Sequence, residues 1–333
     1  MNNSFQEILL TEHKVARDRI SPNALKVTDR LQRAGFKAYV VGGAPRDLLL
    51  GFTPKDFDVG TDATPEQVRE LFRNARLIGR RFRLAHVRFG REIIEVATFR
   101  GTGGVGDSGD NSERSVEDGG RVLRDNVFGS EAEDAIRRDF TINALMYDPS
   151  NETIRDYTDG YADLARRKLR LIGDPELRYR EDPVRMLRAI RFKSKLGLEI
   201  DGPSETPIPE MAPLLADIPP ARLLDELLKL LLGGRAWDGL ETLVEYRLWH
   251  ELFPGLLGAP ECPPRLIEQA FRNTDDRVAQ DKPVTPGFLF AALFWPRARE
   301  EARRREENGQ PPVEALAAAG EKVFSKYTSR VSI

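Results

Sequence analysis

Two aspartates separated by one residue, Asp56 and Asp58, are the pair in the sequence most suggestive of chemistry. A strand places side chains at positions i and i+2 on the same face, so the two carboxylates lie side by side. Their repulsion favours a divalent cation between them, and such oxygen ligands suit Mg²⁺, which binds a few carboxylates together with substrate phosphates. Two such ions can hold the attacking and leaving oxygens of an in-line displacement. The pair therefore predicts Asp56 and Asp58 as catalytic residues and metal ligands.

A glycine-rich turn precedes the aspartates, in the run Gly-Gly-Ala-Pro-Arg-Asp at residues 42–47. Because they lack side chains, Gly42 and Gly43 let backbone N–H groups approach phosphates closely, and Arg46 supplies a fixed positive fork. Each motif alone has an ordinary structural explanation, since Asp-x-Asp is common at exposed strand edges and Gly-Gly is common in turns. In this order, after an apolar strand, they predict a nucleotide-binding site.

Further charged residues are candidates for the same site. Arginines at a helix start can hold triphosphate oxygens in a bidentate manner, which predicts Arg137 and Arg138 as nucleotide ligands. The neighbouring Asp139 has a structural alternative, because an acid near a helix N-terminus is favoured by the macrodipole. Glu95 lies in an apolar strand, where an acid has a partner or a metal, so a metal ligand and a buried ion pair are equal alternatives. His86 is predicted as a hydrogen-bonded core histidine.

Local patterns predict the elements that position these residues. The apolar run 38–41 predicts a buried strand, residues 44–50 a helix, and residues 57–59 the next strand. Residues 84–89 and 92–99 predict two strands joined by a hairpin turn. Asp58 and Glu95 are thereby assigned to predicted strands.

Helical patterns dominate after residue 131. Residues 139–147 predict a buried helix, residues 154–171 a hairpin, and residues 219–232 a strong amphipathic helix. A further long amphipathic helix is predicted directly after Asp182 and Pro183. The fold class is therefore predicted as α+β, a mixed-sheet head followed by an all-helical neck and body.

The chain of 333 residues is too long for one small core, and its 40% hydrophobic content is ample for burial. We predict a flexible leader at 1–20, a head at 21–150, a neck at 151–215 and a helical RNA-binding body at 216–333. Residues 101–120 have almost no apolar content, which predicts a flexible acidic loop within the head. This loop lacks the Gly-Lys-Ser/Thr ending of a phosphate-binding P-loop.

The overall charge does not decide the binding partner. The net charge is −2, but arginines gather in residues 73–91 and 178–191, and surface fields follow the local distribution. The single cysteine, Cys262, excludes a disulfide framework within one chain. The N-terminus has no basic start followed by an apolar run, and no window approaches the roughly 18 apolar residues of a membrane span. We expect a cytoplasmic, monomeric protein without a membrane partner.

The glycine turn followed by Asp-x-Asp resembles the head domain of the class II tRNA nucleotidyltransferase and bacterial poly(A) polymerase family. The resemblance continues, in family order, in Arg-Arg-Asp-Phe-Thr-Ile-Asn at 137–143 and in Arg-Glu-Asp-Pro-Val-Arg-Met-Leu-Arg-Ala-Ile-Arg-Phe at 180–192. It implies a nucleotidyltransferase head of the polymerase-beta-like fold, Mg²⁺ as cofactor, a nucleoside triphosphate as substrate and RNA 3′ ends as partner. It also adds Asp139 to the catalytic carboxylates.

The third block implies base selection. In the related tRNA enzymes the matching Asp and Arg hydrogen-bond the base edge, so the resemblance implies that Asp182 and Arg185 read the incoming base. The chemistry suits this role, because Asp only accepts and Arg only donates hydrogen bonds. Arg188 and Arg191 continue the spacing along one helix face and would serve the base stack or the triphosphate. The structural alternative is a solvated stripe of arginines.

The family divides into enzymes that add C, C and A to tRNA and enzymes that add poly(A) tails. The run Leu-Ile-Gly-Arg-Arg-Phe-Arg-Leu-Ala-His-Val at 77–87 resembles the poly(A) polymerases. Within it, Arg80, Arg81 and Arg83 could contact RNA phosphates, and Phe82 could stack on a base. The sequence thus predicts template-independent transfer of AMP from ATP to RNA 3′ ends. CCA addition to tRNA and a non-catalytic RNA-binding role stay open as alternatives.

The C-terminal residues 322–333 do not resemble the family. The polymerases run on to a basic arm that helps to hold RNA, so we expect a body shortened at this end. Phosphate contacts dominate binding of this kind, and a shorter body is therefore expected to hold RNA less tightly.

Overall fold

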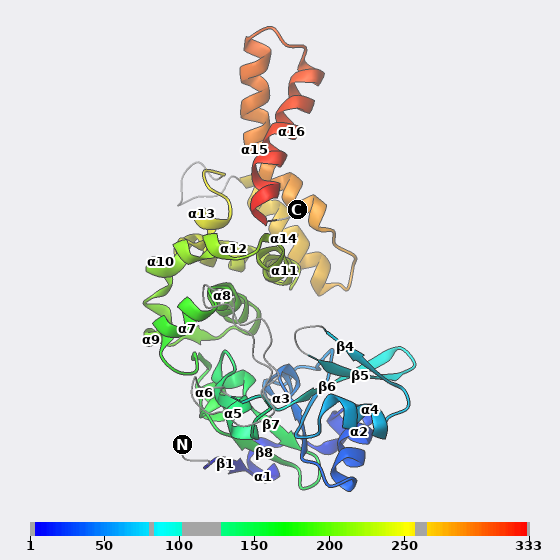
Figure 1. Cartoon of the computed structure of the whole chain (residues 1–333). Coiled ribbons are helices and arrows are strands. Elements are labelled where there is room, and N and C mark those ends of the chain that lie inside the picture. Colours follow the sequence, from blue (N-terminus) through cyan, green and yellow to red (C-terminus); the bar gives the residue numbers. More distant parts are fainter. Residues whose placement is uncertain (1–3, 80–82, 102–127, 257–264, 332–333) are drawn as a thin grey trace, which may run out of the picture. The chain divides into compact units, whose positions relative to one another are not determined.

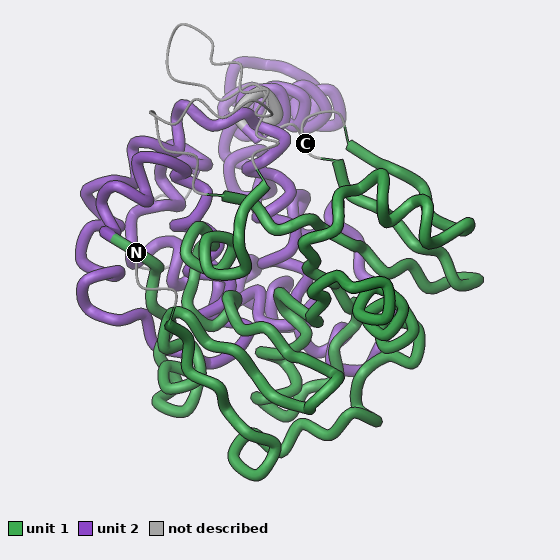
Figure 2. Tube along the Cα trace, turned by 60° about the horizontal axis from the view of Figure 1, so that its bottom comes forward, with its two compact units in different colours: residues 1–173 green, residues 174–333 purple. Residues whose placement is uncertain are grey.

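The computed structural model describes residues 4–79, 83–101, 128–256 and 265–331. The chain divides into two compact units, residues 1–173 and 174–333 (Figure 2). The first unit is a mixed sheet with helices, and the second is built almost entirely of helices (Figure 1). The predicted α+β class, with a nucleotidyltransferase head followed by helices, is therefore confirmed. The predicted loop at 101–120 lies, after its first residue, outside the described residues.

One eight-stranded sheet forms the described part of the N-terminal unit, in the order β1-β8-β7-β2-β3-β6-β5-β4. The strands are β1 (Gln6–Ile8), β2 (Ala38–Val41), β3 (Asp58–Thr61), β4 (Ala75–Ile78), β5 (Leu84–Phe89), β6 (Glu92–Thr98), β7 (Met146–Asp148) and β8 (Thr153–Asp156). The central pair β3 and β6 runs parallel, whereas the other described pairings of this sheet are antiparallel. The sheet brings three of the predicted strands, β2, β3 and β6, next to one another.

Short helices connect the strands of this unit. They are α1 (Leu10–His13), η1 (Arg17–Arg19), α2 (Pro22–Arg33), α3 (Gly43–Leu49), α4 (Pro65–Leu71), α5 (Glu131–Ile136), η2 (Thr141–Asn143) and α6 (Gly160–Ala165), followed by the short strand β9 (Lys168–Leu169). Two starts have clear sequence causes. Ser21 accepts hydrogen bonds from backbone N–H groups of α2, and Thr64 forms a capping box with Gln67 at the start of α4.

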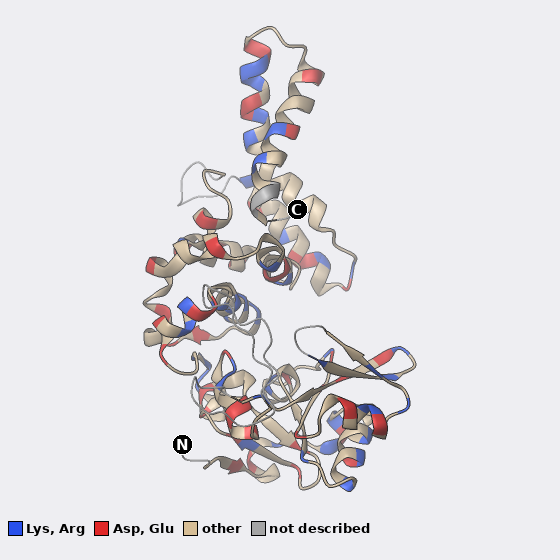
Figure 3. Cartoon of the chain, in the orientation of Figure 1, with Lys and Arg blue, Asp and Glu red and all other residues tan. Residues whose placement is uncertain are grey.

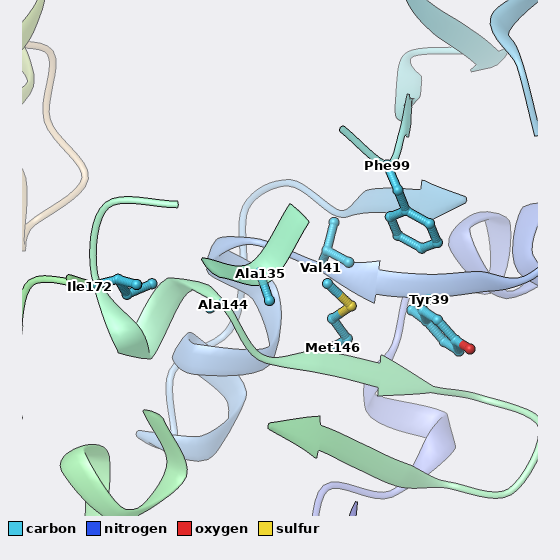
Figure 4. Packing of buried hydrophobic residues seen from close by; sticks show 7 residues of the cluster. All are labelled: Tyr39, Val41, Phe99, Ala135, Ala144, Met146 and Ile172. Atoms are coloured by element: carbon cyan, nitrogen blue, oxygen red, sulfur yellow. The ribbon is translucent and has the colours of Figure 1, made fainter. Parts of the chain in front are cut away.

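A compact apolar cluster fixes the strand that leads into the glycine turn (Figure 4). Tyr39 and Val41 of β2 pack with Met146 of β7 and with Phe99, which follows β6. The Tyr39 and Phe99 rings are stacked with their centroids 6.0 Å apart. All four side chains are at most 3% exposed, so their burial holds β2 firmly within the sheet.

Two predictions about the N-terminal unit were wrong. Residues 1–20 are no loose leader in their described part, because β1 pairs with β8 and Ile8, Val15 and Ile20 are buried. Residues 139–147 form the 3-10 turn η2 and part of strand β7 instead of a helix. The apolar content was read correctly as buried, but a short apolar run does not by itself distinguish a strand from a helix.

The boundary of the head also differs from the prediction. Residues 154–171 are not a hairpin, because β8 pairs with β7 and β1 and is followed by α6. The sheet therefore includes residues beyond 150, and the first unit extends to Gly173. The division of the remaining chain into a neck and a body at residue 215 stays a prediction.

The C-terminal unit consists of helices joined by short connections. They are α7 (Pro175–Glu181), α8 (Val184–Leu196), α9 (Gly202–Glu205), α10 (Ile208–Met211), η3 (Ala212–Asp217), α11 (Pro220–Leu231), α12 (Ala236–Glu245), α13 (Leu248–Leu252), α14 (Arg265–Ala279), α15 (Pro286–Glu307) and α16 (Pro312–Val331), with the short strand β10 (Glu199–Ile200). The predicted helices after Pro183 and at 219–232 are confirmed as α8 and α11. None of the described helices is long and apolar enough to cross a bilayer.

Basic and acidic side chains alternate along α15 (Figure 3). Arg297 pairs with Glu300 at 2.8 Å, and Arg304 and Arg305 both pair with Glu301. These i,i+3 and i,i+4 pairs support the long helix and neutralise much of its charge. The described arginines of α15 therefore do not add up to a uniformly basic surface.

Candidate active site

The carboxylates meet where β3 begins. Asp58 is the first residue of β3, and Asp56 lies in the connection that leads to it. Parallel pairing places Asp58 opposite Glu95 of β6, and antiparallel pairing places Glu95 opposite His86 of β5. Directly opposed residues of paired strands share one face of a sheet. Asp58, Glu95 and His86 thus form a row of titratable side chains across three strands.

The carboxylate of Asp58 is held in an unfavourable surrounding. Burial raises its pKa to about 6, and the negative charges of Glu95 and Asp56 act in the same direction, opposed by Arg138. Such a site gains from a divalent cation, which neutralises the crowded oxygens. Among the described residues, no three His, Cys, Asp or Glu side chains are gathered as a complete metal site. Asp56 and Asp58 fit Mg²⁺, because this ion needs only one or two carboxylates when phosphates complete its shell.

Glu95 has a partner of its own. Its Oε2 lies 3.2 Å from Nε2 of His86, and the two side chains are 41% and 27% exposed. His86 is hydrogen-bonded as predicted, but it is no core residue, and the pair is too exposed to be the buried ion pair that the sequence left open. Metal binding by Glu95 stays a prediction.

Glycine is required at the turn before α3. Gly42 has φ +77°, in the left-handed region, and a Cβ atom there would lie 3.2 Å from Oδ2 of Asp58 and 4.0 Å from Nη1 of Arg138. Gly43 is similarly close to Arg46, whose Nη2 would lie 3.2 Å from a Cβ atom. Gly42 thus lies at the point where a carboxylate and a guanidinium converge, and its conformation and surroundings disfavour a side chain.

The two arginines predicted as nucleotide ligands are oriented by one buried acid. Asp134 is 4% exposed, and its carboxylate accepts from Nε of Arg137 at 3.1 Å and from Nη2 of Arg138 at 2.8 Å. The nearby guanidinium groups hold the pKa of Asp134 below its usual range despite its burial. Asp134 therefore stays charged and fixes the direction in which both arginines extend.

Arg46 does not lie as the sequence suggested. Its guanidinium belongs to a residue only 6% exposed, and it donates to Oδ1 of Asp47 and, at 2.6 Å, to Oδ1 of Asn143. The Asn143 amide in turn donates to Oδ1 of Asp139 at 2.9 Å. This placement favours a supporting role for Arg46 over direct contact with a phosphate. Arg137 caps the C-terminal end of α5, and Arg138 and Asp139 follow it, so the predicted helix start at these arginines and the helix N-terminal alternative for Asp139 were wrong. Asp139 is a half-buried residue.

The predicted base-selecting residues lie at the start of α8 in the C-terminal unit. Asp182 closes α7, and its Oδ2 accepts from Nη2 of Arg222 at 2.9 Å. Arg185 donates to Oε2 of Glu181 at 2.6 Å and to the carbonyl oxygen of Arg178 at 2.7 Å. Both side chains are thus held in place by neighbours from within this unit.

Arg188 and Arg191 share one buried partner. Glu226 of α11 is 6% exposed and accepts from Nη1 of Arg188 at 3.3 Å and from Nε of Arg191 at 2.9 Å. Lys229 adds a third cation at 3.1 Å, and the pKa of Glu226 is lowered, since these cations outweigh its burial. The alternative of a purely solvated arginine stripe is therefore wrong. Contact of Arg188 and Arg191 with a nucleotide stays a prediction.

Of the four predicted RNA-binding residues, only Arg83 lies in the described part of the chain. Arg83 is exposed and pairs with Glu66 of α4 at 2.7 Å. Arg80, Arg81 and Phe82 lie outside the described residues. The RNA-binding role of all four residues stays a prediction.

Comparison with known proteins places this geometry in a family. The model of the poly A polymerase head domain matches residues 38–170, and that of a probable RNA- and SrmB-binding site of polymerase A matches residues 197–258. Poly(A) polymerase I of Escherichia coli O6:H1 is 52% identical over 328 residues, which cover 97% of this chain and 70% of that protein. The chain belongs to the bacterial poly(A) polymerase family.

More distant members of this family are CCA-adding enzymes. The enzyme of Bacillus pumilus is 37% identical over 234 residues, covering 70% of this chain and 55% of that protein. The crystal structure of the Bacillus stearothermophilus CCA-adding enzyme in complex with CTP superimposes with a TM-score of 0.58 at 29% identity, over 92% of this chain and 83% of that one. The fold is common to both branches, whereas the sequence lies much nearer to the poly(A) polymerases.

Sequence reasoning missed the residues that support this polymerase-family site. Asp134, Asn143 and Glu226 contact predicted site residues, but none of them was singled out as a site residue. For Asn143 a signal was present, because it closes the block that begins at Arg137. Glu226 lies in an amphipathic helix and gave only the pattern of a charged residue among leucines.

Proposed function

We propose that the protein transfers AMP from ATP to the 3′-hydroxyl of RNA without a template and releases pyrophosphate. One observation supports this most directly. At Gly42 the carboxylate of Asp58 and the guanidinium of Arg138 converge over a backbone that tolerates no side chain. Metal ligand, phosphate ligand and open backbone are the three parts that a nucleotidyl transfer site needs. The 52% identity to a poly(A) polymerase I supports ATP and RNA as substrates.

The residues divide the work as follows. Asp56 and Asp58, with Asp139 and Glu95 in support, would hold two Mg²⁺ ions. When bound, such ions neutralise the triphosphate and lower the pKa of the attacking hydroxyl. Gly42 and Gly43 admit the triphosphate to the backbone.

Arg137 and Arg138 contact its oxygens, in directions set by their pairing with Asp134. The bond from the RNA 3′-oxygen to the α-phosphorus forms as the bond to the β-phosphate oxygen breaks. The hydroxyl proton is released, and pyrophosphate leaves.

Adenine selection is proposed for Asp182 and Arg185. An acceptor and a donor at the start of α8 can pair with the amino group and the ring nitrogen of adenine. Their present partners, Arg222 and Glu181, hold both side chains in defined positions. A site built to hydrogen-bond one base rejects others because its buried polar groups are then left unpaired. Cytosine presents the same amino donor and ring-nitrogen acceptor as adenine, whereas uracil presents the reverse pattern, so Arg185→Ala is expected to lose the preference for ATP over UTP.

Primer extension on a generic RNA, with each nucleotide offered separately and Mg²⁺ present, tests the proposal. Successive additions with ATP alone are expected. CCA addition is the alternative that the shared fold supports, and it is tested with a tRNA that lacks its CCA end. Strong CTP incorporation on that tRNA would replace polyadenylation by tRNA repair. RNA binding without pyrophosphate release from any nucleotide would instead favour a non-catalytic protein.

A further inference from the structure

A buried asparagine lies at the centre of the predicted active-site residues. Asn143 ends the turn η2 and is 7% exposed. Its Nδ2 donates to Oδ1 of Asp139 at 2.9 Å, and its Oδ1 accepts from Nη1 of Arg46 at 2.6 Å. Its backbone oxygen also accepts from Nη1 of Arg138 at 3.2 Å. One residue thus contacts a predicted catalytic carboxylate, a predicted phosphate ligand and a buried arginine.

The chemistry of its neighbours fixes the orientation of the Asn143 amide. A guanidinium only donates, so the amide oxygen must face Arg46, and a carboxylate only accepts, so the amide nitrogen must face Asp139. Arg46 itself cannot turn easily, because its Nε and Nη2 both donate to Oδ1 of Asp47 and it is 6% exposed. The amide oxygen of Asn143 is therefore fixed by Arg46, which is itself fixed by its ion pair with Asp47 in helix α3.

Asp139 receives a second fixed hydrogen bond. The backbone N–H of Phe140 donates to the same Oδ1 at 2.8 Å. With two donors on one oxygen, rotation of the carboxylate would break at least one bond, so the direction of the whole group is set. Outer contacts of this kind orient catalytic ligands, and their loss commonly lowers activity about 10- to 100-fold.

We propose that Asn143 is a positioning residue, which holds Asp139 in its working orientation and is itself anchored by Arg46. Arg46 then serves this network and not the triphosphate. The inference rests on the proposed adenylyl transfer for the role of Asp139, but it concerns how that side chain is held. It predicts that Asn143 acts on the reaction through Asp139.

A double-mutant cycle tests this dependence. Asn143→Ala is expected to lower kcat/KM for ATP about 10- to 100-fold. When Asp139→Ala is already present, the same change is expected to cost less than about threefold, because the group it positions is gone. If the loss of kcat/KM in the double variant equals the product of the losses in the two single variants, the proposal is overturned. The cycle is repeated on the Kd of Mg·ATP by calorimetry, which needs no turnover.

Two further variants separate positioning from folding. Asn143→Asp keeps an acceptor for Arg46 but replaces the donor to Asp139 by a like charge, so it is expected to lose activity at pH 8 although the bond to Arg46 remains. Thr141→Ala is the matched control, because it removes a buried hydrogen bond from the same turn, the 2.7 Å bond to Asp163. It is expected to change kcat/KM less than about threefold. A loss for Thr141→Ala equal to that for Asn143→Ala would overturn the proposal.

The outcomes distinguish this inference from the proposed function. A wild-type protein that adds AMP, combined with multiplicative losses in the cycle, would reject the role of Asn143 alone. A wild-type protein that binds Mg·ATP without adding AMP would reject adenylyl transfer. In that case the cycle on the Kd still decides whether Asn143 acts through Asp139.

Discussion

Two carboxylates, one in each unit, have opposite electrostatic surroundings. In the N-terminal unit, Asp58 lies near two other acids, and burial raises its pKa to about 6. In the C-terminal unit, Glu226 is surrounded by Arg188, Arg191 and Lys229, and its pKa is lowered. Asp58 has too little positive charge nearby to offset its burial, whereas the cations around Glu226 more than offset its burial. A site that must receive a cation keeps its acids crowded, whereas a site that must present directed arginines neutralises its acid permanently.

The largest effect is expected for Asp58→Asn. The neutral amide cannot replace a carboxylate at a metal site, so AMP incorporation should fall at least about 10³-fold. The variant is assayed by primer extension at saturating Mg²⁺, with circular dichroism to establish that it is folded. Asp62→Asn is a control, since Asp62 is exposed and only accepts from the Lys37 backbone. Activity within tenfold of wild type in Asp58→Asn would remove Asp58 from the chemistry.

Glu226→Gln is expected to destabilise the fold. The change leaves two partly buried arginines with less compensation, which should lower the free energy of unfolding by about 1 to 3 kcal/mol. The KM for ATP should also rise, because Arg188 and Arg191 lose their direction. Urea denaturation measures the first effect and steady-state kinetics the second. Unchanged stability would mean that water compensates the arginines as well as Glu226 does.

The metal-free protein should itself become more stable on losing Asp58. Its folded-state pKa, about 6, lies above the ordinary value of 3.8, so the charged form is disfavoured by folding. The penalty is complete above pH 6 and absent below pH 4, where both states are protonated. Asp58→Asn should therefore gain about 2 kcal/mol at pH 7.5 with chelator present, and nothing at pH 3.5. Thermal melts at both pH values measure this, and equal gains at both would contradict the assignment.

Activity should show the same titration. Below about pH 6 the proton competes with Mg²⁺ for Asp58, so kcat/KM should fall about tenfold per pH unit at low Mg²⁺. Raising the Mg²⁺ concentration should move this limb to lower pH. A limb whose position is independent of Mg²⁺ would place the critical proton on another group.

The smallest effect is expected for an exposed pair. Arg83 and Glu66 are 57% and 46% exposed, so Arg83→Ala should change the free energy of unfolding by less than about 1 kcal/mol. If Arg83 contacts an RNA phosphate as predicted, the variant should bind RNA more weakly with a shallower salt dependence. Fluorescence anisotropy with labelled RNA at several salt concentrations measures the slope. Glu66→Ala is the control, because it breaks the same pair while keeping the arginine.

The sequence was sufficient to predict several strands around the site, but not the turn that carries Asp139 and Asn143. The strands around residues 38–41, 84–89 and 92–98 and the glycine turn were predicted because their signals are local. The approach of Asp58 to Glu95 was not, since it depends on a parallel pairing of β3 with β6 that no local pattern specifies. Strand register follows from the whole sheet and not from any one segment.

The misplacement of Arg46 has a similar cause. An arginine next to a Gly-Gly turn looks like a phosphate ligand, and only the contact with Asn143 reveals its buried anchoring position. The role of Asp134 could not be predicted for the same reason, because nothing in its local sequence indicates that Arg137 and Arg138 both pair with it. A supporting residue can be recognised only from its contacts in the folded structure. A reacting residue can be recognised from its side-chain type, which is visible in the sequence.

The pairing of β1 with β8 has a consequence for how the protein is made. Gln6 lies opposite Asp156, so β1 leaves the ribosome well before its partner β8 is synthesised. At ordinary rates of translation this interval is on the order of ten seconds. During that time the apolar side chain of Ile8 is exposed, and the backbone N–H and C=O groups of β1 lack their partners on β8. The catalytic half of the nascent chain is thus a natural client for chaperones until β8 has been translated.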